Sequence, residues 1–324
     1  MTLFDETTVG AYAASRGLVD DGPLRVASLS GGVSNIVMLV ESGQRRVVVK
    51  QALGRLRVAD EWRADPARSQ AEAAALQVLG ALTPDAVPVV LDADPERDAL
   101  IISAAPPHWT MWKTELLGGF VRPEVASRLG SLLRVWHSAT DHQPLPTILE
   151  RTDLFEQLRL EPYFGTAARR RPALAAGLAS VACSVRDRRR CIVLGDFSPK
   201  NVLVGPDGMW VIDLEVAHRG DPSFDLAFLV THLIAKAVHL PEARTLLIAA
   251  TGAFLDHYGD GPGADNAPHI ARLVGALLIA RVAGSSPLEY LSTTEQERIE
   301  AIGTWLLTDR EGLLADALQE VGGL

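Results

Sequence analysis

The chain has 324 residues, which suits one large or two modest domains with a substantial core. Hydrophobic residues make up 48% and charged residues 22%, as in ordinary globular proteins. A formal net charge of −9 argues against nucleic acid and anionic membranes as main partners, and 2 cysteines are too few for a disulfide framework. Without a signal-like start or an apolar stretch of about 18 residues, we expect a cytoplasmic protein.

The first 107 residues are expected to form a lobe built on antiparallel strands. A helix over 5–17 comes first, and a glycine-rich turn over 30–34 joins the first two strands. A helix over 65–79 follows, because Pro66 fits a first helical turn and apolar residues recur at helical spacing after it. The five expected strands are 24–29, 36–40, 45–50, 87–91 and 99–103.

Residues 108–324 are expected to form a second, mainly helical lobe. Residues 103–108 are expected to connect the two lobes as a hinge. The aromatic residues of 108–112 either stack on a ligand or pack the hinge, and packing is favoured. Helices are predicted over 123–138 and 172–189, and the basic run 169–171 reads as solvated surface or as a phosphate contact.

The most informative stretch runs from the predicted strand 191–194 to Glu215. Gly195 allows a sharp turn that leads to Asp196, and Asn201 follows five residues later. Strands 202–204 and 209–212, joined by a Pro-Asp-Gly turn, then deliver Asp213. Phosphoryl transfer needs one carboxylate to orient the attacking hydroxyl, and a carboxylate with an amide oxygen to hold Mg²⁺. The spacing assigns these roles to Asp196, Asp213 and Asn201, against the plainer reading of a solvated hairpin with chance acids.

These residues resemble the catalytic core of the aminoglycoside-phosphotransferase and choline-kinase superfamily of small-molecule kinases. Leu194 stands where that superfamily usually has a histidine, so we expect a changed support for the loop. The Asp-x-Glu of Asp213 and Glu215 is similar to that of methylthioribose kinases, as are the Lys-Gln-Ala-Leu run at 50–53 and its continuation to residue 72. The resemblance implies a bilobal, protein-kinase-like α+β fold and ATP with Mg²⁺ as cofactors.

The glycine turn and Lys50 complete the expected nucleotide site. Glycines let the backbone approach phosphates closely, and a lysine closing the third strand can reach them, as in kinases. We therefore expect Lys50 to bind phosphate, paired with Glu72 or with Glu61. The residues expected to bind the nucleotide are Gly31, Gly32, Ser34, Lys50 and Glu72.

The remaining chain is expected to form the bulk of the second lobe. Asp225 is interpreted as bracing the catalytic loop through backbone N–H groups. Methylthioribose kinases carry an Arg-Arg pair late in the chain, where this sequence keeps only Arg281, so Arg281 and Glu215 are candidates for substrate contacts. The expected helices cover 226–238, 242–258, 269–282, 287–291 and 293–318.

The predicted function is ATP-dependent phosphorylation of a hydroxyl on a small sugar-like metabolite, with methylthioribose as the first candidate. One alternative is an aminoglycoside kinase, whose polycationic substrate would need an acidic rim that Asp256, Asp260 and Asp265 could supply; Arg281 argues against it. Another is a nucleotide-binding sensor without turnover, which only Leu194 favours. The substrate's identity stays open, and so does the oligomeric state, with a homodimer as one option.

Overall fold

The computed structural model describes residues 3–20, 22–29, 34–57, 62–309 and 313–324. The chain divides into two units. The first contains residues 1–109 together with 203–217, and the second contains 110–202 together with 218–324. The sequence placed the hairpin at 203–217 in the second lobe by its position in the chain, whereas it packs with the first unit.

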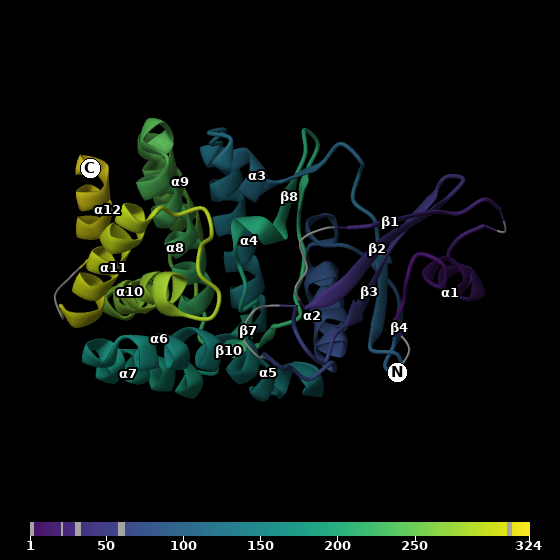
Figure 1. The fold of residues 1–324 in the computed structure, drawn as a ribbon, viewed down its shortest axis with the longest axis horizontal. Helices are drawn as coiled ribbons and strands as arrows, with labels where there is room; N and C mark the ends of the chain where they lie inside the picture. The colour runs from purple at the N-terminus through teal and green to yellow at the C-terminus, as the bar shows by residue number, and fades with distance from the viewer. Residues whose placement is uncertain (1–2, 21, 30–33, 58–61, 310–312) are drawn as a thin grey trace. The chain divides into compact units, whose positions relative to one another are not determined.

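The first unit contains a five-stranded antiparallel sheet with the strand order β1-β2-β3-β5-β4 (Figure 1). Lys50 lies near the end of β3, with Val37 and Leu100 as its neighbours on the flanking strands. The α+β class and a five-stranded sheet are confirmed, but the fourth strand, predicted over 87–91, lies at Val90–Asp94. The strands are β1 (Arg25–Ser28), β2 (Asn35–Ser42), β3 (Arg45–Ala52), β4 (Val90–Asp94) and β5 (Ala99–Ser103), and the helices α1 (Val9–Ser15) and α2 (Arg68–Leu82) accompany them.

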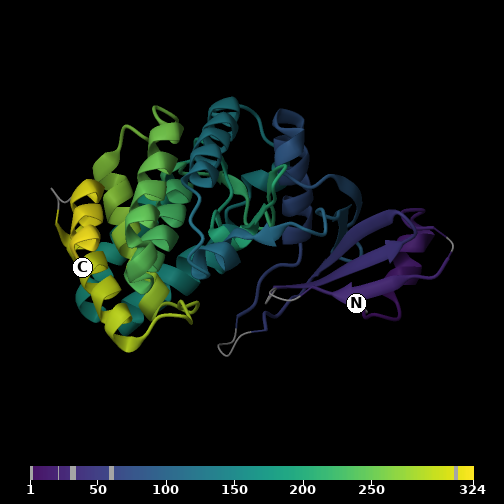
Figure 2. The ribbon, with the colours of Figure 1, turned by 90° about the horizontal axis from the view of Figure 1, so that it is seen from above.

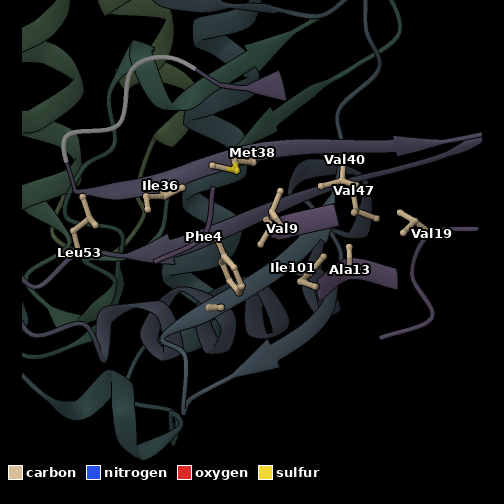
Figure 3. Packing of buried hydrophobic residues seen from close by; sticks show 12 residues of the cluster. Phe4, Val9, Ala13, Val19, Ile36, Met38, Val40, Val47, Leu53 and Ile101 are labelled. Carbon is tan, nitrogen blue, oxygen red and sulfur yellow. The ribbon is translucent and has the colours of Figure 1, made fainter. Parts of the chain in front are cut away.

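A hydrophobic core lies between this sheet and the N-terminal segment (Figure 3). Phe4 and Val9 reach it from the N-terminal segment, and Met38, Val47 and Ile101 reach it from the sheet. The β-branched run of β3 therefore supplies buried side chains, as alternating strands with one packed face do. This core anchors the strand that carries Lys50.

The hairpin of β8 (Val202–Val204) and β9 (Met209–Val211) lies in the last chain segment that belongs to the first unit. Its turn meets the hinge, because the Trp109 indole N–H donates a hydrogen bond to Asp207 at 2.8 Å and the Trp109 and Trp210 rings lie 5.5 Å apart, edge to face. Packing, the favoured interpretation of the hinge aromatics, is therefore what Trp109 does here. Asp213 follows β9 with a φ of 64°, a left-handed backbone conformation that is uncommon outside glycine.

The second unit is built from helices around α8, which is buried along nearly its whole length (Figures 1 and 2). Helices α4 and α9 pack closely because Gly130 faces the Phe254 carbonyl, where a Cβ atom would lie only 2.2 Å from the oxygen. The longer helices are α4 (Pro123–Thr140), α7 (Ala175–Asp187), α8 (Ser223–His239), α9 (Arg244–Tyr258), α10 (Ala267–Ala283), α11 (Thr293–Thr308) and α12 (Leu314–Gly323).

Two shorter elements of the second unit position the catalytic loop. One of them is a π-helix, η3 (Glu156–Gly165). Strand β7 (Cys191–Val193) pairs with β10 (His218–Gly220), which the sequence did not predict. Cys191 in β7 is buried, whereas Cys183 is exposed.

Two predicted helices near the end of the chain are wrong. Residues 287–291 contain a turn at 289–290 and otherwise irregular backbone, although Leu288 and Leu291 are buried as a helix stripe would be. The helix predicted over 293–318 ends at Thr308, and a separate helix α12 begins at Leu314. In the part of the chain that the structure describes, no helix is both long enough and apolar enough to cross a membrane.

Candidate active site

In the first unit, Lys50 lies between two carboxylates. Its ammonium nitrogen is 2.6 Å from a Glu72 oxygen and 2.7 Å from an Asp213 oxygen. Lys50 reaches them from β3, Glu72 from α2 and Asp213 from the end of the β8–β9 hairpin. Of the two glutamates considered as partners for Lys50, the structure pairs Glu72 with it, and Glu61 lies outside the described residues.

A second buried group of charges lies beside the first. Arg68, which is fully buried, donates from Nε to a Glu215 oxygen at 3.0 Å and from Nη2 to the backbone oxygens of Ser34 and Leu53. The same Glu215 oxygen accepts a bond from the Asn35 amide at 2.8 Å. Glu215 therefore joins Asn35, at the start of β2, to Arg68, at the start of α2. Gly31 and Gly32 lie outside the described residues.

The charges in the first unit are unbalanced. Burial disfavours the charged form of Lys50, but Asp213 and Glu72 outweigh it and raise its pKa above the ordinary value. Burial raises the pKa of Glu72, and the negative charges of Asp213 and Glu215 add to the rise while Lys50 opposes it. Among the described residues, Lys50 and Arg68 thus pair with three carboxylates, those of Glu72, Asp213 and Glu215.

In the second unit, the backbone around Gly195 is held by Asp225. Both carboxylate oxygens of this buried side chain accept backbone bonds, from Leu194 N–H at 2.7 Å and from Gly195 N–H at 2.9 Å. This is the bracing role predicted for Asp225. His137 of α4 lies 3.3 Å from the same carboxylate and so supports the loop through Asp225. It does so from α4, whereas the superfamily's usual histidine would stand at the position of Leu194. Gly195 itself has a φ of 72°, which glycine adopts without strain.

The Asp196 carboxylate, which is buried, binds two cations. One oxygen lies 2.8 Å from an Arg159 nitrogen and 2.9 Å from the Lys200 ammonium nitrogen. The Asn201 side-chain N–H₂ donates to the Asp196 backbone oxygen at 3.0 Å, which turns the Asn201 amide nitrogen inward and leaves its carbonyl oxygen for another partner. The loop therefore holds a carboxylate and an amide oxygen in fixed positions.

Arg281 of α10 lies elsewhere in the second unit, against η3. Its Nη1 donates to the Tyr163 hydroxyl at 2.9 Å and to the Ser286 hydroxyl at 3.2 Å. The Tyr163 ring also has Arg159 beside it, with the guanidinium carbon 5.5 Å from the ring centre. One aromatic ring thus separates Arg281 from the arginine that binds Asp196.

The sequence-predicted residues fall into two sets. Within the first unit the structure brings together Ser34, Lys50, Glu72, Asp213 and Glu215, and within the second it brings together Asp196 and Asn201.

Two cations at Asp196 were missed by sequence reasoning. Lys200 is four residues beyond Asp196, a spacing that could have flagged it. Arg159 is 37 residues upstream in an element whose π-helical form has no clear sequence pattern, so no local signal pointed to it.

Comparison with known proteins places these features in a family. Residues 25–273 match the model of the phosphotransferase enzyme family. Among curated proteins, methylthioribose kinase 1 of Oryza sativa subsp. japonica is 26% identical over 242 residues, which are 65% of this chain and 56% of that protein. The methylthioribose kinase of Pectobacterium carotovorum subsp. carotovorum is 26% identical over 275 residues, with 74% of this chain and 68% of that protein covered.

Solved structures support the fold. The amicoumacin kinase hAmiN superposes with a TM-score of 0.59 at 14% identity, and 96% of each chain is covered. The chain spans little more than half the length of the rice enzyme, so the likeness to that enzyme is a likeness of part of it. The match over most of the chain shows that it belongs to the phosphotransferase enzyme family.

Proposed function

We propose that this chain is an ATP-dependent kinase that transfers a phosphoryl group to a hydroxyl of a small, sugar-like metabolite. The observation that carries the proposal is Lys50, which is buried between Glu72 and Asp213. A lysine held in place by a helix glutamate, next to a carboxylate that follows a strand, is the arrangement that kinases use on nucleotide phosphates. Glu72 fixes the position of the ammonium group, and Ser34 with Gly31 and Gly32 belongs to the turn that would cover the phosphates.

Asp196 is the proposed catalytic residue. Its carboxylate would orient the attacking hydroxyl and accept its proton. Arg159 and Lys200 hold that carboxylate in a fixed rotamer, and Asp225 fixes the backbone on its N-terminal side. A fixed carboxylate loses little freedom when substrate binds, which is how positioning lowers a barrier.

Asp213 and Asn201 are the proposed ligands of Mg²⁺, a cation that prefers oxygen ligands and keeps part of its coordination for water and phosphate. Asp213 belongs to a group that has an excess carboxylate, and Asn201 keeps its amide oxygen for another partner. No cluster of three or more His, Cys, Asp or Glu side chains that could hold a metal ion occurs among the described residues. When bound, Mg²⁺ would neutralise charge on the phosphates.

Methylthioribose is the first substrate to test, because several relatives bear that name at 23 to 26% identity. Arg281 remains the proposed contact for substrate or transferred phosphate, and Glu215, whose bonded oxygen is used by Arg68 and Asn35, remains a candidate for substrate or metal. With cellular ATP as the proposed donor, a cytoplasmic location stays part of the proposal.

The test is ADP release by the purified protein with Mg²⁺-ATP, measured against sugars, amino alcohols and aminoglycosides, with methylthioribose included. We expect stimulation by a hydroxylated metabolite and its loss in Asp196→Asn, which keeps the shape of the side chain. The proposal is overturned if the protein fails to bind ATP, or if Asp196→Asn releases ADP as fast as the unchanged protein does.

A further inference from the structure

Helix α8 carries a lysine where a core helix would carry an apolar residue. Lys236 is 1% exposed, and the helix around it is buried from Ser223 to Val238. Its ammonium nitrogen has one hydrogen bond, to the His232 backbone oxygen at 3.5 Å, and lies 5.3 Å from the centre of the Tyr290 ring. It pairs with no carboxylate of the described residues. A buried ammonium without an anion is costly, so such a residue calls for an explanation.

Arg281 is a second buried cation in the same region without an acidic partner. Its two hydrogen bonds run to the neutral hydroxyls of Tyr163 and Ser286, and its Nε has no partner at all. Two further buried polar atoms are also unpaired, the hydroxyls of Tyr290 and Thr231. Unpaired buried donors in native structures are rare, and of these atoms the Tyr290 hydroxyl belongs to the ring that lies beside the Lys236 ammonium.

Aromatic side chains connect this group to the catalytic carboxylate. The Tyr163 ring has Arg281 at 5.5 Å and Arg159 at 5.5 Å from its centre, and Arg159 binds Asp196. Phe228 packs against the Tyr163 ring at 6.0 Å and against His232 at 5.3 Å, one helical turn before Lys236. A continuous series of side-chain contacts therefore runs from Arg281 and His232 to Asp196.

The electrostatic environment agrees with a missing anion. Burial and the positive charges of Lys113 and Arg281 lower the pKa of Lys236 to about 7. Burial and nearby cations, Arg281 first, also lower the pKa of His232 far below its ordinary value.

Each carboxylate near this region either pairs with another cation or is exposed to solvent. Asp196 binds Arg159 and Lys200, Glu295 binds His239, and Glu289 is exposed and acts on Lys113. The region therefore has an excess of positive charge that no described side chain neutralises.

We propose that Lys236 and Arg281, helped by the Tyr290 hydroxyl, bind an anionic group of the acceptor, so that the substrate is a hydroxy acid or a sugar phosphate. This inference rests on the proposed kinase function and narrows its substrate class. A carboxylate or phosphate would accept the unused Arg281 Nε–H and the Lys236 ammonium protons, which are the strong kind of charge-assisted hydrogen bond. A cationic amino alcohol or an aminoglycoside would instead be repelled.

The experiment compares acceptors that differ in charge. ADP release is measured with D-glycerate and D-gluconate for the carboxylate arm, ribose 5-phosphate for the phosphate arm, and ribose, methylthioribose and choline as neutral and cationic acceptors. The variants are Lys236→Met, which keeps length and removes charge, and Arg298→Met as a matched control on the exposed face of α11. We expect an anionic acceptor to be preferred and its KM to rise about 30-fold or more in Lys236→Met, with Arg298→Met unchanged.

A pH series separates charge from shape. As Lys236 loses its proton above pH 7, the KM for the anionic acceptor should rise with pH in the unchanged protein and stay flat in Lys236→Met. Preference for a neutral or cationic acceptor, or an unaltered KM in Lys236→Met, overturns the inference while leaving the kinase function standing.

The remaining case is a protein that binds the anionic compound but releases no ADP. Binding measured without ATP identifies it. Calorimetry with D-gluconate and ribose 5-phosphate on the full chain needs no turnover. Binding that Lys236→Met weakens supports the anion site even if no acceptor releases ADP, a result that would count against the kinase function alone. If neither compound binds and neither releases ADP, the anion site is rejected.

Discussion

Lys50 in the first unit has a carboxylate on either side, whereas Lys236 in the second unit has none. Both are buried, and both would be unstable as isolated charges. The Lys50 ammonium is paired before any ligand arrives, so its position is fixed and its charge is kept. Lys236 is left without an anion, so its charge depends on what binds. The partners of a buried lysine therefore distinguish one that is fixed in place, as Lys50 is, from one that is left to bind a ligand, as we propose for Lys236.

The largest effect is expected at Asp196. Asp196→Asn removes the charge that Arg159 and Lys200 hold, and with it the proposed base, so turnover should fall on the order of 1000-fold while ATP affinity changes little. Steady-state ADP release and ATP binding by calorimetry measure the two quantities. A parallel loss of ATP binding would place Asp196 in the nucleotide site instead.

Removing the paired lysine should be the next most damaging change. Lys50→Met leaves Glu72 and Asp213 buried without their cation, which costs about 3–5 kcal/mol of folding free energy when one partner of a buried pair is lost. Urea unfolding measures this loss. The matched change Glu72→Gln still leaves Lys50 with Asp213, so we expect a smaller loss. Equal losses in the two variants would show that the Lys50–Asp213 pair contributes nothing.

The brace under the catalytic loop should have a moderate effect. In Asp225→Asn one of the two backbone N–H groups, of Leu194 or Gly195, loses its acceptor, which costs about 1–3 kcal/mol. The midpoint of urea unfolding and the turnover number should both fall. Turnover that falls while the unfolding midpoint holds would mean that Asp225 acts on the chemistry and not on the loop's backbone.

Lys236→Met should change the free energy of unfolding in the opposite direction, toward a more stable protein. The pKa of Lys236 falls from 10.5 to about 7 on folding, so between these pH values the unfolded chain binds a proton that the folded chain lacks. The unchanged protein should therefore gain stability as the pH rises from 7 to 10. The variant should be more stable by roughly 1–3 kcal/mol near pH 7, and the gain should shrink toward pH 10. A destabilised variant at pH 7 would mean that Lys236 already has an anionic partner.

The parts of the site that the sequence predicted are those encoded locally. Asp196, Asn201 and Asp213 are separated by one loop and one hairpin, so their spacing alone indicated their chemistry. The partner of Lys50 had to be chosen between two glutamates, because a helix that packs on a strand can present either. Arg159 could not be predicted, since it meets Asp196 through the packing of a distant π-helix.

Apolar content misled the sequence analysis in two places. The leucines of 287–291 suggested a helix, but Leu288 and Leu291 are buried in a segment that has no helix. Helix α8 was taken for bulk core because its apolar residues surround it on all sides. A single lysine in such a helix is the signal that could have revealed the unpaired cation, because buried lysines are rare unless paired or functional.

Because Cys191 is buried, the rate at which its thiol reacts measures how often the surrounding structure opens. Burial raises the pKa of its thiol and keeps it protonated, while Cys183 is open to solvent. A thiol-alkylating reagent should therefore modify Cys183 at once and Cys191 only during the moments when strand β7 separates from its surroundings. Strand β7 leads directly into Gly195 and Asp196. The slow rate of Cys191 alkylation would therefore report local opening of the chain next to Asp196, without a label introduced into the protein beforehand.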